Sequence, residues 1–108
     1  MGGVTRTLEV VKLAQKGHLP VTLHSANLSL VTLFSAHIMG SIPNAGKYLE
    51  FSIEGLDYYP WQDNIFSPSF KIVKGQLLMN HKPGWGIEVN PDWLSQSKYQ
   101  VSHVDSSL

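Results

Sequence analysis

The sequence predicts an α/β fold in which helices alternate with short parallel strands. Residues 5–16 and 29–42 have helical patterns and residues 19–23 and 48–53 have strand patterns, so the order is helix, strand, helix, strand. Short loops join these elements, which is typical of parallel strands linked by covering helices. The 108 residues are 43% hydrophobic, which is sufficient for one small core.

Recognisable signals bound the first helix and the first strand. Thr5 is a suitable N-cap, and Gly17 can take a positive φ after the last turn. Between them, apolar residues recur at spacings of three and four and form one helical face. Pro20 cannot donate a ladder hydrogen bond, so it fits at the start of strand 19–23. His24 follows this strand directly.

The second helix, 29–42, is apolar on two faces, so we expect it to be largely buried. Gly40 and Pro43 mark its end. We interpret His37, within this helix, as a core histidine hydrogen-bonded to a neighbouring loop rather than as a ligand. The strand 48–53 places the carboxylate of Glu50 among apolar neighbours, where it is costly to bury without a partner.

The residues beyond 57 have a different character. Lys74-Gly75 lies between two apolar runs and predicts a hairpin. A turn over residues 83–86 precedes a short apolar run, and Asn90-Pro91 predicts a capped short helix. The polar tail, 102–108, is expected to fray.

Composition narrows the classes of function. The chain has 8 basic and 8 acidic residues with no basic patch, so nucleic-acid binding is not predicted. It has no cysteine, which argues against a disulfide framework and a thiolate metal site and fits a cytoplasmic location. The apolar stretch 28–42 is too short and too polar to span a membrane, and the N-terminus lacks a signal-peptide pattern. A membrane partner is therefore not predicted.

The predicted sheet is incomplete. Two parallel strands leave both edges open, whereas parallel strands normally have neighbours and are covered on both faces. We therefore expect a missing portion, supplied by a preceding N-terminal part of the chain or by another subunit, and a homo-oligomer is one such arrangement.

Four side chains are candidates for a functional site. From the residues alone, His24 is either a loop histidine bonded to the backbone or a proton-transfer group, because histidine titrates near neutral pH. Glu50 is either structural or functional, and the pattern does not decide between them. Trp61, with the neighbouring tyrosines, either lines a sugar-binding surface or packs the second half, whereas Trp85 is expected to pack. The fourth, Asn27, ends the polar connection that begins at His24.

The order of these motifs is familiar. The chain resembles the C-terminal end of the enolase superfamily, in its mandelate racemase-like branch of sugar-acid dehydratases, racemases and cycloisomerases. The resemblance rests on Gly2-Gly3-Val4-Thr5, Leu19-Pro20-Val21-Thr22-Leu23-His24, Ala36-His37, Ile42-Pro43-Asn44, Tyr48-Leu49-Glu50, Pro83-Gly84-Trp85-Gly86-Ile87-Glu88-Val89 and Trp93-Leu94.

The resemblance implies the C-terminal part of a modified (β/α) TIM-like barrel and the chain's return to a capping domain. Residues 1–56 would end the barrel domain, with 19–23 and 48–53 as its seventh and eighth strands. Residues 57–108 would pack on the barrel and on the capping domain.

The resemblance also implies roles for the candidate residues. His24 would be the general base or acid that acts on the proton α to a carboxylate, and Glu50 would hydrogen-bond the substrate carboxylate or its enediolate. Asn27 and Trp61 would contact a small sugar acid. No residue would be a metal ligand, because the ligands of the family's Mg²⁺ lie on strands that precede Met1.

Two functional hypotheses follow. In the first, the chain is the C-terminal fragment of a magnesium-dependent enzyme that performs dehydration, racemisation or cycloisomerisation, and the isolated chain is inactive because the metal ligands and the lysine base are absent. In the second, the chain is a non-catalytic remnant that oligomerises or binds a sugar acid.

Overall fold

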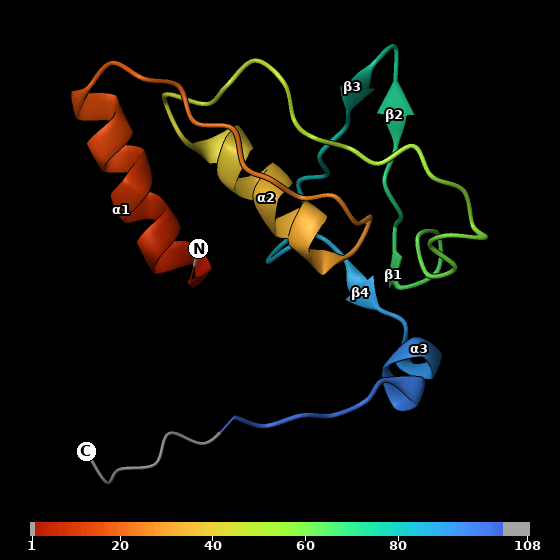
Figure 1. The fold of residues 1–108 in the computed structure, drawn as a ribbon. Coiled ribbons are helices and arrows are strands. Elements are labelled where there is room, and N and C mark those ends of the chain that lie inside the picture. The colour runs from red at the N-terminus through yellow and green to blue at the C-terminus, as the bar shows by residue number, and fades with distance from the viewer. Residues whose placement is uncertain (1, 103–108) are drawn as a thin grey trace, which may run out of the picture.

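The computed structural model describes residues 2–102, so the tail predicted to fray lies outside the described residues except at its start. This part of the chain contains three helices and four very short strands (Figure 1). The elements are α1 (Gly3–Lys16), α2 (Leu30–Ser41), β1 (Phe66–Ser67), β2 (Ile72–Val73), β3 (Gln76–Leu77), β4 (Glu88–Val89) and α3 (Pro91–Gln96).

Helix α1 ends at Lys16 as predicted, but its N-cap lies three residues earlier than predicted and its C-terminal turn closes differently. The helix begins at Gly3, and its N-cap is Gly2, so Thr5 is not the cap. At the other end, Gly17 has a φ of −86°, and the left-handed residue is His18, with a φ of 56°. The amide of Leu19 donates to the carbonyl of Ala14 at 2.9 Å, which closes the last turn one residue later than expected.

The predicted parallel strands 19–23 and 48–53 do not form ladders. Their place is taken by one isolated parallel bridge between Val21 and Ala45. The amide of Val21 donates to the carbonyl of Asn44 at 2.8 Å, and the amide of Gly46 donates to the carbonyl of Val21 at 2.7 Å. A strand is defined by its partners, and within residues 2–102 no further parallel strand lies beside these segments.

The core of the first half lies where α1 and α2 meet the segment between them. Its buried members are Val11, Val21, Leu23 and Ile42, with Ala14, Ile38, Met39 and Ala45 packed against them. Asn44 links the end of α2 to α1 and to the segment after it. Its side-chain amide donates to the carbonyls of Val11 at 3.3 Å and Leu19 at 3.0 Å.

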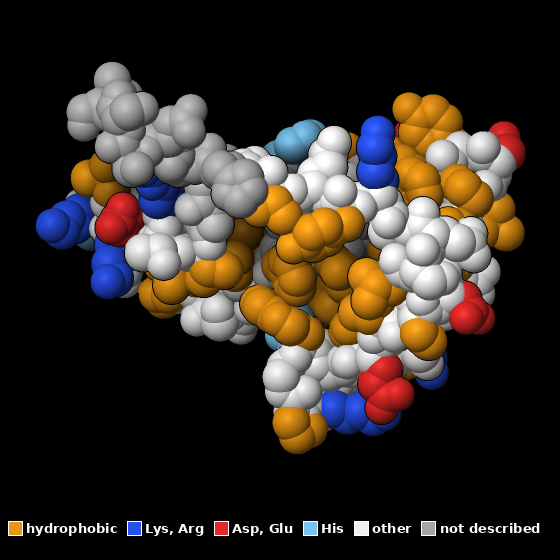
Figure 2. Space-filling view, turned by 90° about the horizontal axis from the view of Figure 1, so that it is seen from below, with side chains coloured by type: hydrophobic (Ala, Val, Ile, Leu, Met, Phe, Trp, Pro, Cys, Tyr) orange, Lys and Arg blue, Asp and Glu red, His pale blue; other side chains and the backbone are white. Residues whose placement is uncertain are grey.

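Helix α2 is buried on one face and not on two. Thr32, Leu33, Ser35 and Ala36 are buried, but Val31 is 52% exposed. The other apolar side chains of the helix are partly covered, since Ile38 packs against the core and Phe34 packs on Trp85. One face of the molecule shows hydrophobic side chains gathered at its centre (Figure 2).

The second half contains two antiparallel pairs. The hairpin β2–β3 pairs Ile72 with Leu77 across Lys74 and Gly75, which both have positive φ, so the predicted hairpin is confirmed. Strand β1 pairs with β4. Helix α3 begins as predicted, with the Asn90 side chain accepting from the amide of Asp92 at 3.0 Å and Pro91 in the first turn.

Trp85 joins the two halves. Its ring centroid lies 4.4 Å from that of Phe34 and 5.2 Å from the ring of His37, both on α2. The Nε2 atom of His37 lies 3.0 Å from the carbonyl oxygen of Trp85, so it carries the proton and donates. The interpretation of His37 as a histidine bonded to a neighbouring loop is confirmed, as is a packing role for Trp85; the His37 side chain is only partly buried.

Candidate active site

The structure brings His24 and Glu50 into direct contact. The Nδ1 atom of His24 lies 2.6 Å from Oε2 of Glu50, although the two residues are 26 positions apart in the sequence. The same carboxylate oxygen accepts a hydrogen bond from the amide of Ser25 at 2.8 Å. Glu50 therefore holds both the ring of His24 and the backbone that follows it.

The local chain conformation aims His24 outward. From Val21 to Ser25 the residues are alternately buried and exposed, which is the period of an extended strand. Leu23 and Ser25 are 6% and 3% exposed, whereas the side chain of His24 is 83% exposed. The bridge at Val21 makes this segment parallel to the one that leads to Glu50. Both side chains thus emerge on the same side of the bridge.

This geometry gives His24 a defined orientation. A carboxylate on Nδ1 fixes the tautomer in which that nitrogen carries a proton, and Nε2 is left to exchange a proton with another molecule. The Glu50 side chain is 42% exposed, so the pair contributes little to the stability of the fold.

Asn27 lies in the loop before α2, two residues ahead of the N-cap Ser29. Its backbone carbonyl accepts from Oγ1 of Thr32 at 2.9 Å, and its side-chain oxygen accepts from the Ser29 hydroxyl at 2.5 Å. These bonds hold Asn27 three residues beyond His24. Asn27 is thus close in sequence to His24, but its side-chain oxygen is already bonded to Ser29, the N-cap of α2.

Trp61 reaches the same loop through a neighbour. Its ring lies 5.4 Å from the ring of Tyr59, and the hydroxyl of Tyr59 donates to the carbonyl of Ala26 at 2.7 Å. The indole Nε1 of Trp61 is buried and has no hydrogen-bond partner among the described residues. An unpaired buried donor is unfavourable. This N–H could donate to an acceptor that residues 2–102 do not supply.

No signal in the sequence marks Tyr59 or Ser25 as a residue that holds the site together. Tyr59 was expected only as part of an aromatic surface, and Ser25 lacks any catalytic motif. Their contributions come from a hydroxyl and a backbone amide that bond to groups distant in the sequence. No spacing in the sequence indicates such contacts.

A metal-binding cluster and a membrane-spanning helix are both absent from residues 2–102. In 2–102, no three side chains of His, Cys, Asp or Glu gather in a way that could hold a metal ion, so these residues do not fit a Mg²⁺ site. In the same range, none of the helices has the length and apolar character that crossing a bilayer requires.

Comparison with known proteins gives a consistent picture. The family described as Enolase C-terminal domain-like matches residues 1–93. The chain is 27% identical over 92 residues to a D-xylonate dehydratase of Haloferax volcanii and 28% identical over 105 residues to a D-mannonate dehydratase of Caulobacter vibrioides. The two matches cover 85% and 95% of this chain, but only 21% and 25% of the two relatives.

Solved structures agree. The fold matches that of a candidate racemase from Roseobacter denitrificans with a TM-score of 0.83 and 55% identity, over 95% of this chain and 28% of the other. An enolase of the mandelate racemase subgroup from Agrobacterium tumefaciens matches with a TM-score of 0.68 at 23% identity, which shows a shared fold. The chain thus spans about a quarter of the length of these proteins, and it belongs to the enolase C-terminal domain-like family.

Proposed function

We propose that this chain is the C-terminal part of an enolase-superfamily enzyme that acts on a sugar acid, and that His24 and Glu50 belong to its active site. The observation that carries the proposal is the 2.6 Å contact between His24 Nδ1 and Glu50 Oε2. Family membership is consistent with it, because the resemblance assigns both residues to the same site. The names of the two dehydratase relatives support a sugar acid as the substrate class.

In this proposal His24 moves the proton α to the substrate carboxylate through Nε2. The contact with Glu50 keeps Nδ1 occupied, so proton exchange is directed to the exposed nitrogen. Glu50 would lie on the side of the substrate carboxylate, where a hydrogen bond that strengthens as charge develops lowers the barrier. Asn27 and Trp61 would contact the hydroxyls and the carbon chain of the sugar acid.

Dependence on Mg²⁺ is part of the proposal for a complete enzyme only. The described residues do not fit a metal site, so its ligands would lie outside this chain and we derive no step through it. Residues 1–56 would then end a barrel and residues 57–108 would pack on it and on a capping domain. A cytoplasmic location stays a prediction, which the absence of cysteine supports.

A chimera tests the roles of His24 and Glu50. The 28% of the Roseobacter protein that this chain matches, at 55% identity, is replaced by this chain. The parent and the chimera are then assayed with Mg²⁺ for exchange of the α proton of D-xylonate and D-mannonate into D₂O. We expect His24→Asn to slow exchange about 10²–10⁴-fold, and Glu50→Gln to slow it about 10²-fold.

His18→Asn is the matched control. His18 is exposed and has a φ of 56°, which asparagine tolerates, so this substitution should leave the exchange rate unchanged. A folded chimera in which His24→Asn exchanges at the parental rate would refute the catalytic role. Exchange that is absent with both sugar acids in parent and chimera alike would refute the substrate class.

One observation favours the alternative of a non-catalytic oligomerising module. Large hydrophobic side chains are exposed, among them Leu13 at 71% and Ile53 at 97%, and residues 47–53 run without a backbone ladder in the described structure. Open strand edges promote association. The isolated chain is therefore expected to associate and to show no Mg²⁺-dependent activity; a monomer with measurable dehydration would contradict both expectations.

A further inference from the structure

The loop between His24 and α2 is held at three consecutive residues. The amide of Ser25 donates to Glu50, the carbonyl of Ala26 accepts from Tyr59, and the carbonyl of Asn27 accepts from Thr32. Two of these three anchors come from the first half of the chain. The third, from Tyr59, is supplied by the second half across 33 positions of sequence.

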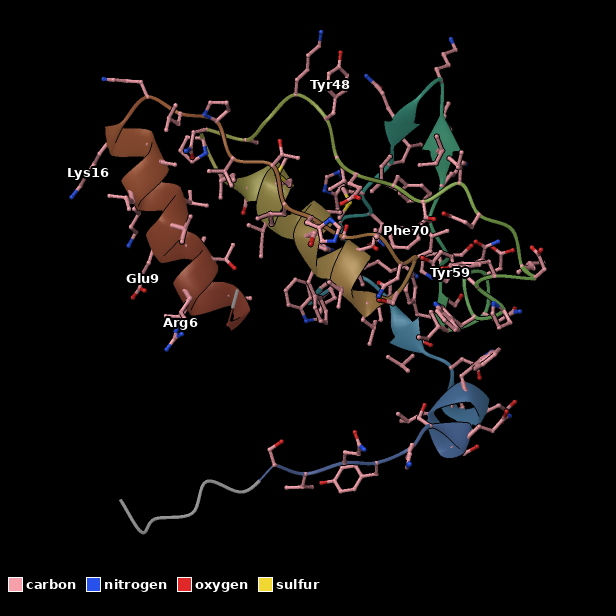
Figure 3. The ribbon with its side chains drawn as sticks, in the orientation of Figure 1. Arg6, Glu9, Lys16, Tyr48, Tyr59 and Phe70 are labelled. Carbon is pink, nitrogen blue, oxygen red and sulfur yellow. The ribbon has the colours of Figure 1, made fainter. Side chains whose placement is uncertain are left out.

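The segment that carries Tyr59 is itself well fixed. The amides of Tyr58 and Tyr59 both donate to the carbonyl of Gly55 at 3.0 Å, and the amide of Gln62 donates to the carbonyl of Tyr59 at 3.1 Å. This segment faces the end of the loop that precedes α2, and Tyr59 is labelled in Figure 3. The Tyr59 hydroxyl is therefore presented from a compact turn and not from a free chain.

The ring of Tyr59 is also the centre of an aromatic row. Its centroid lies 4.7 Å from that of Tyr58 in an edge-on arrangement and 5.4 Å from that of Trp61. Such pairs add directional attraction to simple burial. Tyr59 thus contacts Trp61 with its ring and the His24–Asn27 loop with its hydroxyl.

We propose that Tyr59 is a positioning residue, which fixes the His24–Asn27 loop against the aromatic segment 58–61 and so sets the spacing between His24 and Trp61. The inference rests on the proposed function for the meaning of that spacing, namely the width available to a sugar acid. The hydrogen bond itself is independent of any substrate. Without it, the loop is held by its two remaining anchors and opens more often.

The absence of cysteine allows a direct test. Ser25→Cys introduces a single thiol at a position that is 3% exposed, inside the loop. Ala36→Cys introduces a single thiol at a position that is 4% exposed, in α2. Their rates of reaction with a thiol reagent, measured in separate proteins, report opening of the loop and opening of the helical core. Each reporter is combined with Tyr59→Phe, which keeps the ring and removes the hydroxyl.

A neutral hydrogen bond contributes about 1 kcal/mol. We therefore expect Tyr59→Phe to raise the reaction rate of the Ser25→Cys thiol about fivefold and to leave that of the Ala36→Cys thiol within twofold. Tyr58→Phe is the matched control, because Tyr58 is the adjacent, 64% exposed tyrosine, and it should change neither rate. Replacement of Tyr59 by 4-aminophenylalanine, which retains a donor, should restore the slow rate.

The outcomes separate this inference from the proposed function. Equal acceleration at both thiols, including complete unfolding by Tyr59→Phe, would show a global structural role and overturn the proposal, as would no acceleration at either. The thiol measurements need no sugar acid. A failure of the proton-exchange assay with normal thiol results would therefore refute the proposed function and leave the Tyr59 anchor in place.

Discussion

The two halves of the chain form their backbone hydrogen bonds in different ways. In residues 2–56, β pairing is limited to the bridge between Val21 and Ala45. In residues 57–102, every short strand has an antiparallel partner. Antiparallel strands can be joined by a two-residue turn, whereas parallel strands need partners brought by long connections. Strands with local partners therefore form ladders in residues 2–102, whereas the parallel segments 19–23 and 48–53 form none there.

The halves also differ in what packs them. The first half buries a compact group of aliphatic side chains between its two helices. The second half has one fully packed aromatic residue, Phe66, at 3% exposure, whose ring lies 5.2 Å from that of Phe70. Burial of aliphatic surface therefore stabilises the first half, and tight turns with aromatic contacts stabilise the second.

The largest effect is expected from the core of the first half. Leu23→Ala removes a side chain that is 6% exposed within the core, and it should lower the free energy of unfolding by about 2–4 kcal/mol. Leu19→Ala, in the same segment but 61% exposed, should cost less than about 1 kcal/mol. Urea unfolding followed by circular dichroism measures both. Equal losses would show that the core does not hold this half together.

Local signals in the sequence predicted the elements that need only local partners. The positive-φ pair Lys74-Gly75 and the cap Asn90-Pro91 each specify a turn within a few residues, and both are present in the structure. The strands predicted at 19–23 and 48–53 are absent, although Val21 to Ser25 keep the alternation of an extended chain and Val21 forms one bridge. The ladders could not be predicted, because pairing depends on segments that a pattern of polar and apolar residues does not identify.

For the candidate site, the sequence identified the main residues but not all of the contacts between them. The family resemblance placed His24 and Glu50 on two neighbouring strands, the predicted seventh and eighth, and the structure places the two side chains in contact. Their roles, and those of Asn27 and Trp61, stay predictions. The bond from Tyr59 to Ala26 had no signal in the sequence, because it joins a side chain to a backbone carbonyl, and any residue supplies a carbonyl.

A smaller loss of stability is expected from a substitution at Gly86, in the turn before β4. Gly86 has a φ of 71°, and a Cβ there would clash with the side chain of Asn80, which donates to the Gly86 carbonyl at 2.9 Å. Gly86→Ala should therefore lower the free energy of unfolding by about 2 kcal/mol, since it combines the cost of a left-handed alanine with the loss of that hydrogen bond.

Gly75→Ala is the control for Gly86→Ala. Gly75 has a φ of 75°, but a Cβ at this position would meet nothing within 4 Å. It carries the conformational cost alone, about 1 kcal/mol. Urea midpoints of the two variants give the difference. If Gly75→Ala is as destabilising as Gly86→Ala, the contact with Asn80 does not stabilise the turn.

The smallest effect concerns the junction between the halves. His37→Ala removes the hydrogen bond to the Trp85 carbonyl and one edge-on ring contact, and it should lower the free energy of unfolding by about 1 kcal/mol. Tryptophan emission should shift to longer wavelength at the same time, because Trp85 loses a neighbour and is already 41% exposed. His24→Ala, whose side chain is 83% exposed, should change neither property. A loss of stability without a change in emission would mean that His37 supports α2 alone, and the two halves would then be joined by the packing of Phe34 on Trp85.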